Sequence, residues 1–400
     1  MANSILTPTM VTREILRVLH QKLNFVGSIN REYDSSFAKD GAKIGSTLKI
    51  RLPNKYTVTT GATLNVQDTT ESSVTLTVAT QKHVGMNFTS QDLTLSLDDF
   101  SKRIIEPATA VLAANIEADA MSMYKDVYNQ ANQSTITAAL SLQTLLQGRK
   151  LMNDNLAPLS PRVANLTTQN NVDLINDLKG LFQDSKELSS QYREGAMGRA
   201  VGFDFYENSL WARHTSGTET ASGTIAVNGA SQTGATITVT NGSSKTLKAG
   251  DIITFVGCNA VHAETKADLG YKKQFVVTED LGTSGTSLKV SPAIVTSGAN
   301  QNVSASPTTG QAIAKVGGAS GQMDVSMLYH PDAFTFATAD LIMPKGVDFA
   351  AREVQDGLSI RLVRQYDINN DALPCRVDLL YGYKTLRPEL ACRLASNSST

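Results

Sequence analysis

The chain has 400 residues, of which 41% are hydrophobic, and its 36 Lys plus Arg against 37 Asp plus Glu give a formal net charge of -1. This length exceeds what one hydrophobic core usually serves, so we expect two or three structural units. The balanced charge excludes a strong attraction to nucleic acid or anionic lipid. We therefore predict no sequence-specific nucleic-acid partner.

The amino terminus has neither a basic segment nor a continuous apolar run, and no window approaches about 18 apolar residues. We therefore expect neither secretion nor membrane contact. Cys258, Cys375 and Cys392 lie far apart and lack C-x-x-C spacing, which is typical of a reducing compartment and fits no zinc site. Buried, unreactive thiols are expected.

The first part of the chain reads as an arm. Residues 9–23 place Ile15, Leu16, Leu19 and Leu23 on one helical stripe, while the polar stretch 27–45 offers no core face. We therefore expect this helix to pack on a distant part of the chain or on a neighbouring subunit.

Residues 47–52 and 73–79 alternate apolar and polar side chains, which predicts two strands. Their connection of about twenty residues is longer than a hairpin loop, and is either disordered or an arm that binds something. Lys49, Arg51 and Lys55 form a basic cluster at its start. This cluster is either a solvated strand edge or a source of ion pairs between subunits.

Residues 98–128 carry apolar side chains at helical spacing, namely Phe100, Ile104, Ala108, Val111, Leu112, Ile116, Ala120, Met123 and Val127. Asp98 is the expected N-cap, and Pro107 marks either a kink or the true first turn. A helix of this length would extend roughly 45 Å. We therefore interpret it as a strut.

Further along, helices are predicted at 140–152 and 171–182, and strands at 162–166 and 201–205. From 215 to 320 Gly, Ser and Thr dominate and short apolar runs alternate with turns, which indicates a small all-β barrel or sandwich. Gly-rich flanks are typical of the linkers of an inserted domain. The surrounding domain is therefore expected to be split in sequence.

At the carboxyl end, residues 358–365 and 377–386 are predicted to pair across a turn at 367–371. Pro388 should end that pairing. Leu390, Cys392 and Leu394 then anchor the terminus. Arg387 and Glu389 remain polar at the bend, as candidates for contact between subunits.

Catalytic chemistry finds little support. The five histidines are scattered and none lies in an H-E-x-x-H arrangement. His262 and Glu264 come nearest to a ligand pair but lack further ligands, and the Gly-rich run 195–202 lacks the Lys-Ser/Thr of a phosphate loop and is better explained as a turn. We expect no catalytic, cofactor or metal site.

The order of the arm helix, the segment 45–53, the long loop, the long helix, the segment 193–206 and the closing segment 381–389 resembles the major capsid proteins of tailed bacteriophages. More narrowly, it is similar to coat proteins of short-tailed phages that carry an immunoglobulin-like domain inserted in the capsid fold shared with herpesviruses. Segments 249–266 and 274–278 match that insertion. The resemblance spans nearly the whole chain.

The resemblance implies an α+β capsid fold with an N-arm, an extended β-loop, a long spine helix, peripheral and axial domains, and an inserted small all-β domain. The implied boundaries are 1–44 for the arm, 45–90 for the loop and flanking strands, 91–130 for the spine helix, 131–214 with 321–400 for the capsid core, and 215–320 for the insertion.

The resemblance also implies a non-enzymatic subunit of the virion, forming pentamers and hexamers of an icosahedral shell around double-stranded DNA. Assembly would occur in the host cytoplasm with a scaffolding protein, and a portal would occupy one vertex. The insertion would serve as folding nucleus and exterior decoration. Candidate subunit-interface residues are Arg13, Arg17, Arg51, Lys55, Arg103, Glu106, Arg387 and Glu389.

The Ser/Thr/Gly-rich β region leaves a second hypothesis open, a phage tail or adhesin protein. Adhesins more often repeat such modules, and no repeat is visible here. Megadalton closed particles would indicate the capsid protein, and a compact trimer the adhesin. An enzyme is a third hypothesis, which a pocket with a perturbed His or carboxylate would favour.

Overall fold

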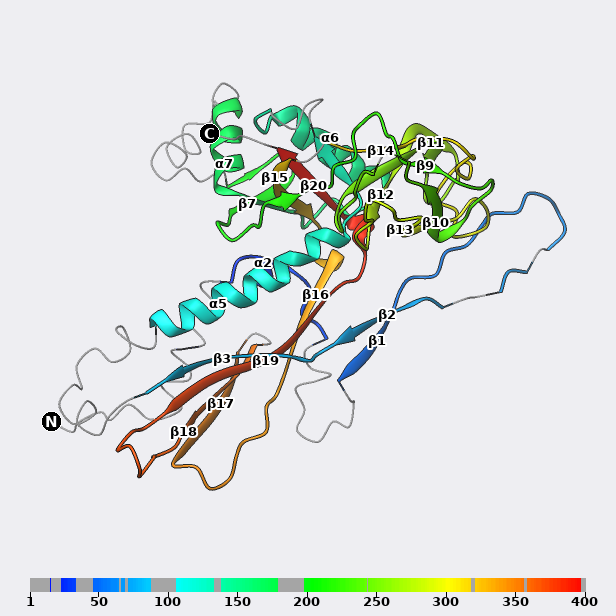
Figure 1. Ribbon diagram of the computed structural model, residues 1–400. Coiled ribbons are helices and arrows are strands. Elements are labelled where there is room, and N and C mark those ends of the chain that lie inside the picture. Colours follow the sequence, from blue (N-terminus) through cyan, green and yellow to red (C-terminus); the bar gives the residue numbers. More distant parts are fainter. Residues whose placement is uncertain are drawn as a thin grey trace. The chain divides into compact units, whose positions relative to one another are not determined.

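The computed structural model (Figure 1) describes residues 15, 23–33, 46–64, 66–68, 71–87, 106–132, 138–178, 198–242, 244–317, 321–355 and 358–396. The chain forms two compact units. Unit 1 comprises residues 1–51, 73–121 and 334–384, and unit 2 comprises 52–72, 122–333 and 385–400. In the part of the chain so described, no helix has the length and apolarity needed to cross a bilayer.

Unit 1 is built on a five-stranded sheet of order β16-β19-β18-β17, with β3 also paired to β19. The strands are β3 (Thr80–Met86), β16 (Phe334–Ala339), β17 (Phe349–Gln355), β18 (Leu358–Arg364) and β19 (Cys375–Thr385). Strands β18 and β19 pair antiparallel with Leu362 opposite Val377, so the predicted hairpin is confirmed. Alternation places Leu358, Ile360 and Leu362 in the core.

The two strands predicted around the long loop are also present. β1 (Thr47–Arg51) and β2 (Ser73–Thr77) pair antiparallel, with Thr47 opposite Thr77. The described residues of the connecting loop, 52–64, 66–68 and 71–72, contain no helix or strand.

The long helix ends earlier than its sequence pattern predicts. Helix α5 spans Glu106–Met121, with Pro107 in its first turn, and the chain continues as a 3₁₀ helix, η2 (Ser122–Asp126). A continuous α-helix to residue 128 was therefore wrong, because periods of 3.0 and 3.6 residues are indistinguishable over so short a stretch. The predicted start at residue 98 lies outside the described residues.

The buried face of α5 also differs from the prediction. Val111 is exposed, whereas Leu112, Ile116 and Ala120 are buried as expected, together with the carboxylate of Glu117. Glu117 accepts the backbone N–H groups of Phe25 and of Val26, the latter at 3.1 Å from Oε2. These N–H groups open the short helix α2 (Phe25–Ser28), where no partner exists within the helix itself.

Residues 23–30 are therefore part of unit 1. The Phe25 and Phe334 rings pack with centroids 5.6 Å apart, and Asn30 forms a β-bridge with Thr335. Of the predicted arm helix, only Ile15 and Leu23 are described, and both side chains are buried.

Unit 2 contains a seven-stranded sheet of order β4-β20-β15-β5-β7-β6, with β8 also paired to β15. Its strands are β4 (Gln130–Asn132), β5 (Val163–Leu166), β6 (Arg199–Ala200), β7 (Phe203–Glu207), β8 (His214–Thr215), β15 (Gln322–Tyr329) and β20 (Ala391–Ser396). Segments on both sides of the Gly/Ser/Thr-rich region therefore share one sheet.

Helices α6 (Leu142–Asp154) and α7 (Thr168–Leu178) belong to the same unit. Ser141 caps α6 by accepting the Thr144 N–H at 3.3 Å. Gly148 permits close packing of α6 on the sheet, because a Cβ there would lie 2.7 Å from Leu328 and 3.1 Å from Leu394.

The Gly/Ser/Thr-rich region forms a six-stranded antiparallel sheet of order β14-β11-β12-β13-β10-β9. Its strands are β9 (Ala226–Val227), β10 (Gly234–Thr240), β11 (Ile252–Val261), β12 (Asp268–Val277), β13 (Ser287–Ile294) and β14 (Ile313–Lys315). The core includes Phe255 and Phe275, whose ring centroids are 5.5 Å apart. The chain enters through β8 and leaves through β15, and these strands pair with each other.

The carboxyl end follows the predicted path. The 3₁₀ turn η4 (Pro388–Leu390) separates β19 from β20, and Leu390, Cys392 and Leu394 are fully buried. All three cysteines are free and buried, which confirms the expectation of buried thiols.

Candidate assembly surface

A groove of about 630 Å³ in unit 2 brings together three of the predicted interface residues, Lys55, Arg387 and Glu389. Its walls come from loop 52–72, the end of α6 at Asn155 and Leu156, the loops at 263–264 and 299–300, and the turn 386–389. Segments far apart in sequence thus form one concave surface.

Arg387 and Glu389 pair with each other on this surface. The Arg387 Nε lies 3.0 Å from Glu389 Oε1, and both side chains are about one-third exposed. The intervening Pro388 occupies the first position of the η4 turn, which brings residues 387 and 389 to the same side. Such a half-exposed pair contributes little to stability.

Lys55 lines the groove, and Lys266 is bonded to two segments of its wall. Lys266 Nζ donates to the carbonyls of Ala263 and Ala299, each at 2.7 Å. Burial, and secondly the charge of Lys55, lowers the pKa of Lys266.

Lys273 is the most perturbed of these cations. Its ammonium lies 4.5 Å from the centroid of the Tyr128 ring. Burial lowers the pKa of Lys273 to about 8, although Glu389 raises it; Lys55 acts in the same direction as burial. Burial also raises the pKa of Tyr128 well above its ordinary value.

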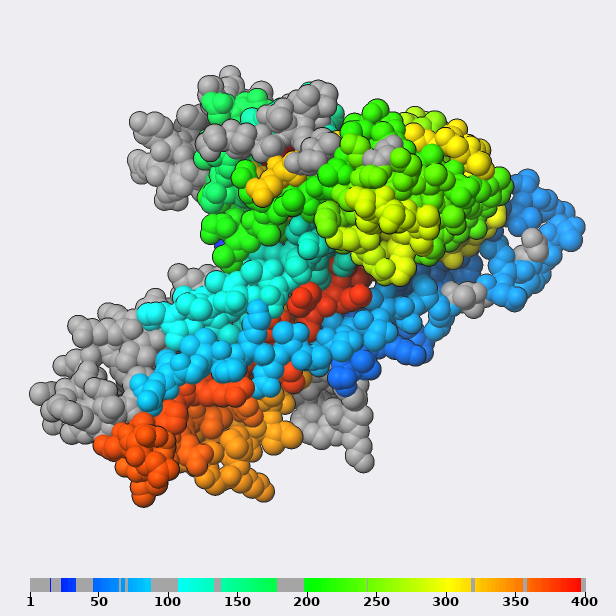
Figure 2. Space-filling model, in the orientation of Figure 1, coloured from blue at the N-terminus to red at the C-terminus, as the bar shows by residue number. Residues whose placement is uncertain are grey.

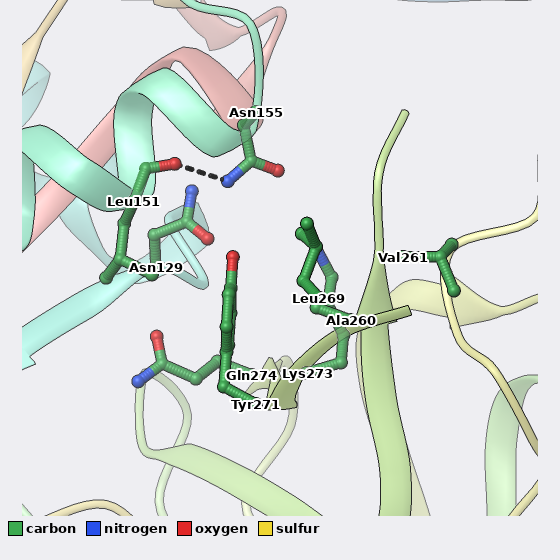
Figure 3. Close-up of a pocket in the computed structure, with 9 residues that line it drawn as sticks. All are labelled: Asn129, Leu151, Asn155, Ala260, Val261, Leu269, Tyr271, Lys273 and Gln274. Atoms are coloured by element: carbon green, nitrogen blue, oxygen red, sulfur yellow. Dashed lines mark hydrogen bonds between the residues drawn. The ribbon is translucent and has the colours of Figure 1, made fainter. Parts of the chain in front are cut away.

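A small cavity of about 10 Å³ lies between the C-terminal end of α6 and strand β12. Figure 3 shows the residues that line it, Lys273 among them. Its polar lining includes Asn129, Asn155, Tyr271 and Gln274. The Tyr271 hydroxyl points toward α6 and donates to Asp154 Oδ2 at 3.1 Å. The volume is about that of one water molecule, so the contact between α6 and β12 is polar and nearly closed.

A second polar contact joins β12 to the seven-stranded sheet. Gln130 and Gln274 exchange two hydrogen bonds, from the Gln130 N–H to Gln274 Oε1 at 2.7 Å and from Gln274 Nε2 to the Gln130 carbonyl at 2.9 Å. The Gln274 side-chain amide thus bonds to the Gln130 backbone as a neighbouring strand would, through one acceptor and one donor. It fixes the position of the six-stranded sheet against β4.

A buried polar network lies where the chain passes between the two sheets of unit 2. His214 Nε2 is 3.0 Å from Asp251 Oδ1, and its Nδ1 is 3.2 Å from the Tyr124 hydroxyl. Asp251 Oδ2 also accepts the N–H groups of Gly217 and Lys248 at 2.9 and 2.8 Å. Every oxygen of this buried carboxylate therefore has a donor.

Burial raises the pKa of Asp251, but the hydrogen bonds from His214 and Lys248, the charge of Lys315 and the hydrogen bond from Gly217 together outweigh it. The pKa therefore lies below its ordinary value. Arg393 completes the network from β20, and burial lowers its pKa to about 10. This network was not predicted from the sequence. The Gly250-Asp251 pair, which the sequence places at a turn before a strand, is the one signal that could have indicated a buried carboxylate here.

Among the remaining predicted interface residues, the structure describes the side chain of Arg51 alone. Arg51 ends β1 in unit 1 and is exposed. Glu106 is the first residue of α5, with only its backbone described, and Arg13, Arg17 and Arg103 lie outside the described residues.

The residues described by the structure contain no group of three His, Cys, Asp or Glu arranged to hold a metal ion. His262 Nδ1 instead accepts the N–H groups of Glu264 at 3.3 Å and Thr265 at 3.2 Å. The His262 and Glu264 pair is therefore explained by a turn. In the described part of the Gly-rich run, Val201 and Gly202 form the turn between β6 and β7.

The described part of the chain is an α+β structure in which a β-rich region, entered through β8 and left through β15, interrupts the seven-stranded sheet. Residues 2–394 match the family model of the P22 coat protein, gene protein 5, so the chain belongs to the P22 coat protein family. It is a phage major capsid protein. This assignment removes the tail and adhesin alternative.

Several solved structures are similar to this chain at low sequence identity. "Mycobacterium phage Che8" has 12% identity and a TM-score of 0.47, covering 93% of this chain and 90% of that one. "Capsid structure of the Cyanophage P-SCSP1u" has 9% identity and a TM-score of 0.44, covering 93% and 89%. "Asymmetric unit of bacteriophage PhiM1 mature capsid" has 12% identity and a TM-score of 0.43, covering 90% and 84%. No curated protein matches this chain.

Proposed function

We propose that this coat protein assembles into pentamers and hexamers of an icosahedral shell that encloses the double-stranded DNA of the virus. The observation that carries the proposal is loop 52–72. Val58 is 96% exposed and Leu64 85% exposed, and Tyr56 and Val66 are also exposed. Figure 2 shows the described part of this loop as blue atoms at the right of the view. Exposed apolar side chains that gather in one loop favour an interaction site, and closed shells require such contacts between copies.

The proposed partners are further copies of the chain, a scaffolding protein and a portal at one vertex, with assembly in the host cytoplasm. The role is structural rather than catalytic. The net charge of -1 supports this role. A shell through which DNA must enter and leave should not bind phosphate groups strongly. The inserted region, residues 215–320, would face the exterior.

The test is sedimentation of the purified full-length chain, alone and with scaffolding protein, together with electron microscopy. Wild-type protein should form closed megadalton particles. Val58→Asp and Leu64→Asp should reduce particle yield, whereas Thr63→Asp adds the same charge to the same loop without removing an apolar side chain. A wild-type chain that stays monomeric in every condition and is missing from virions would overturn the proposal.

A further inference from the structure

The segment between β16 and β17, residues 340–348, is unusually apolar for a surface loop. Its sequence is Asp-Leu-Ile-Met-Pro-Lys-Gly-Val-Asp, although connecting loops are normally rich in polar turn residues. Ile342 is 82% exposed. In Figure 1 this orange segment bows away from the strands it joins. We call residues 341–347 the apolar loop.

The start of this loop is held firmly to the sheet of unit 1. Asp340 accepts the Ser359 hydroxyl at 2.6 Å and lies 3.6 Å from Arg352 Nη2. Arg352 Nη1 also lies 3.4 Å from the Leu341 carbonyl. Finally, Arg361 Nη1 donates to the Ile342 carbonyl at 2.6 Å. Three consecutive residues are thus fixed by side chains of β17 and β18.

Arg361 is itself fixed by a buried carboxylate. Its Nε and Nη2 donate to the two oxygens of Asp378 at 3.0 and 2.6 Å, and Asp378 is fully buried. Because the guanidinium is planar, this two-point contact also fixes the direction of Nη1. Gln81 and Arg376 donate to the same carboxylate at 2.8 and 3.0 Å. The chain of contacts runs from Asp378 through Arg361 to Ile342.

An exposed apolar side chain on a restrained backbone has the properties of an interface anchor. Binding normally costs the entropy of ordering the contact residues, and that cost is smaller when the backbone is already restrained. Large side chains that enter a partner's pocket from such positions provide most of the binding energy of an interface.

The charges around the loop indicate the chemistry of the partner. Arg352, Arg361 and Arg364 are each paired with a carboxylate, of Asp340, Asp378 and Asp348 respectively. Arg361 and Arg352 also donate to loop carbonyls. These three guanidiniums are neutralised within the chain, and the loop itself carries one lysine, the exposed Lys345. The surface therefore offers mainly apolar area rather than a strong field that would attract phosphate groups.

We propose that the apolar loop is a preformed contact site for a second copy of this chain, with Ile342 entering an apolar pocket on that copy. The contact is heterologous, since a projecting loop meets a different surface of its neighbour. The inference rests on the proposed assembly of the chain into shells. It assigns a role in that assembly to Asp378 and Arg361 as positioning residues.

The first experiment compares Ile342→Asp with Ile368→Asp in the full-length chain. Ile368 is 81% exposed and belongs to the same unit, but it lies in a different turn, where Asp367 Oδ1 accepts the Asn369 N–H at 3.0 Å. Ile342→Asp should reduce particle yield without scaffolding protein about tenfold or more. Ile368→Asp should assemble, and both variants should keep the wild-type far-ultraviolet circular dichroism and melting midpoint.

Equal losses in the two variants would overturn the inference, as would normal assembly of Ile342→Asp. A defect of Ile342→Asp seen only with scaffolding protein would also overturn the inference, because the apolar loop would then bind the scaffolding protein and not a second copy of this chain. If wild-type protein forms no particles, the proposed function fails. If wild-type and Ile342→Asp assemble alike, only this inference fails.

A second experiment uses thiol labelling of Ile342→Cys. The three native cysteines are free and buried, and burial raises the pKa of Cys258 and Cys375 to about 11, so background labelling should be low. Maleimide should label Cys at position 342 quickly in free subunits and about tenfold or more slowly in particles. Equal rates in both states would overturn the proposed contact. Adding Arg361→Lys should partly restore labelling in particles, since Lys cannot make the two-point contact.

Discussion

Arg393 in β20 donates an Nη1 proton to the carbonyl oxygen of Gly250 at 2.8 Å, across the contact between the seven-stranded and six-stranded sheets of unit 2. The side chain is fully buried, and its Nε and Nη2 have no hydrogen-bond partner within the described residues. The bond therefore joins the two sheets through a guanidinium that is only partly satisfied.

Arg393→Met should destabilise the protein less than Arg393→Ala. Both changes remove the bond to Gly250, but Met also removes two unpartnered donors and fills much of the volume, whereas Ala leaves a cavity. We expect a loss of about 3 kcal/mol for Ala and about 1 kcal/mol or less for Met. Urea denaturation would measure both, and equal losses would contradict this account.

Asp251→Ala should cost about 3 kcal/mol, because it leaves buried N–H groups of Gly217 and Lys248 without an acceptor. Glu279→Ala is the control, since Glu279 makes an exposed ion pair with Lys289 at 2.6 Å and its loss should change stability by no more than about 0.5 kcal/mol.

Asp251 should also contribute to acid sensitivity. Because its folded-state pKa lies below the ordinary value of 3.8, its contribution is fully present above that value and is lost as the pH falls through the lower, folded-state pKa. Asp251→Asn should flatten the acid limb of a plot of unfolding free energy against pH. An unchanged acid limb would show that other carboxylates dominate it.

Lys273 should have the opposite kind of pH dependence. Its folded-state pKa of about 8 lies below the ordinary 10.5, so the unfolded chain binds more protons between those values and stability rises with pH across that window. Lys273→Met should abolish this rise, on the order of 2–3 kcal/mol. The neighbouring Lys272 is exposed, and the Lys272→Met variant should keep the rise in stability with pH. Chemical denaturation at pH 7 and pH 10 distinguishes the two variants.

Glu117→Ala should release residues 25–28 from unit 1. The carboxylate accepts the N–H groups of Phe25 and Val26, and without it these buried donors lack their acceptor. We expect a loss of about 2 kcal/mol and faster hydrogen exchange of both amides. Glu117→Gln keeps one carbonyl oxygen and should lie between wild type and Glu117→Ala. Unchanged exchange in Glu117→Ala would show that the ring packing of Phe25 suffices.

Arg51→Ala should leave the folding of the free subunit unchanged and weaken assembled shells toward heat and salt. Arg51 is exposed at the end of β1, and Lys49 is exposed on the same strand, so Lys49→Ala is a matched control for loss of one positive charge. Differential scanning calorimetry of subunits and particles provides the measurement. If Arg51→Ala lowers the melting midpoint of the free subunit, its role lies within the fold.

The elements that could be predicted from sequence are those with a regular buried face. Strands β18 and β19 alternate cleanly around Leu362 and Val377, and the β-rich region carries frequent turn residues. By contrast, Val111 fits the helical period of α5 yet is exposed. Period alone assigns a residue to a stripe, but the position of neighbouring segments decides which edge of the stripe is covered.

Polar residues of the candidate surface were harder to predict. Arg387 and Glu389 were expected at the bend. Their ion pair depends on the 3₁₀ geometry of the turn, which residue periodicity does not predict. Lys273 and Glu117 are buried charges whose partners, Tyr128 and the amides of residues 25 and 26, lie distant in sequence. Composition favours such side chains on the surface, so only tertiary structure reveals them.

The pairing of β8 with β15 brings the two ends of the inserted region together, so this region could be exchanged as a unit. The chain leaves and rejoins the seven-stranded sheet at His214–Thr215 and Gln322–Met323, which lie on adjacent strands. A module whose own ends are about 5 Å apart could be exchanged at this point without lengthening any connection. The exchange would not be free of constraint, because any replacement must present a carbonyl to Arg393 and a carboxylate to His214. Arg393 and His214 therefore set the contacts that a transplanted domain, or a domain inserted for display, would have to make.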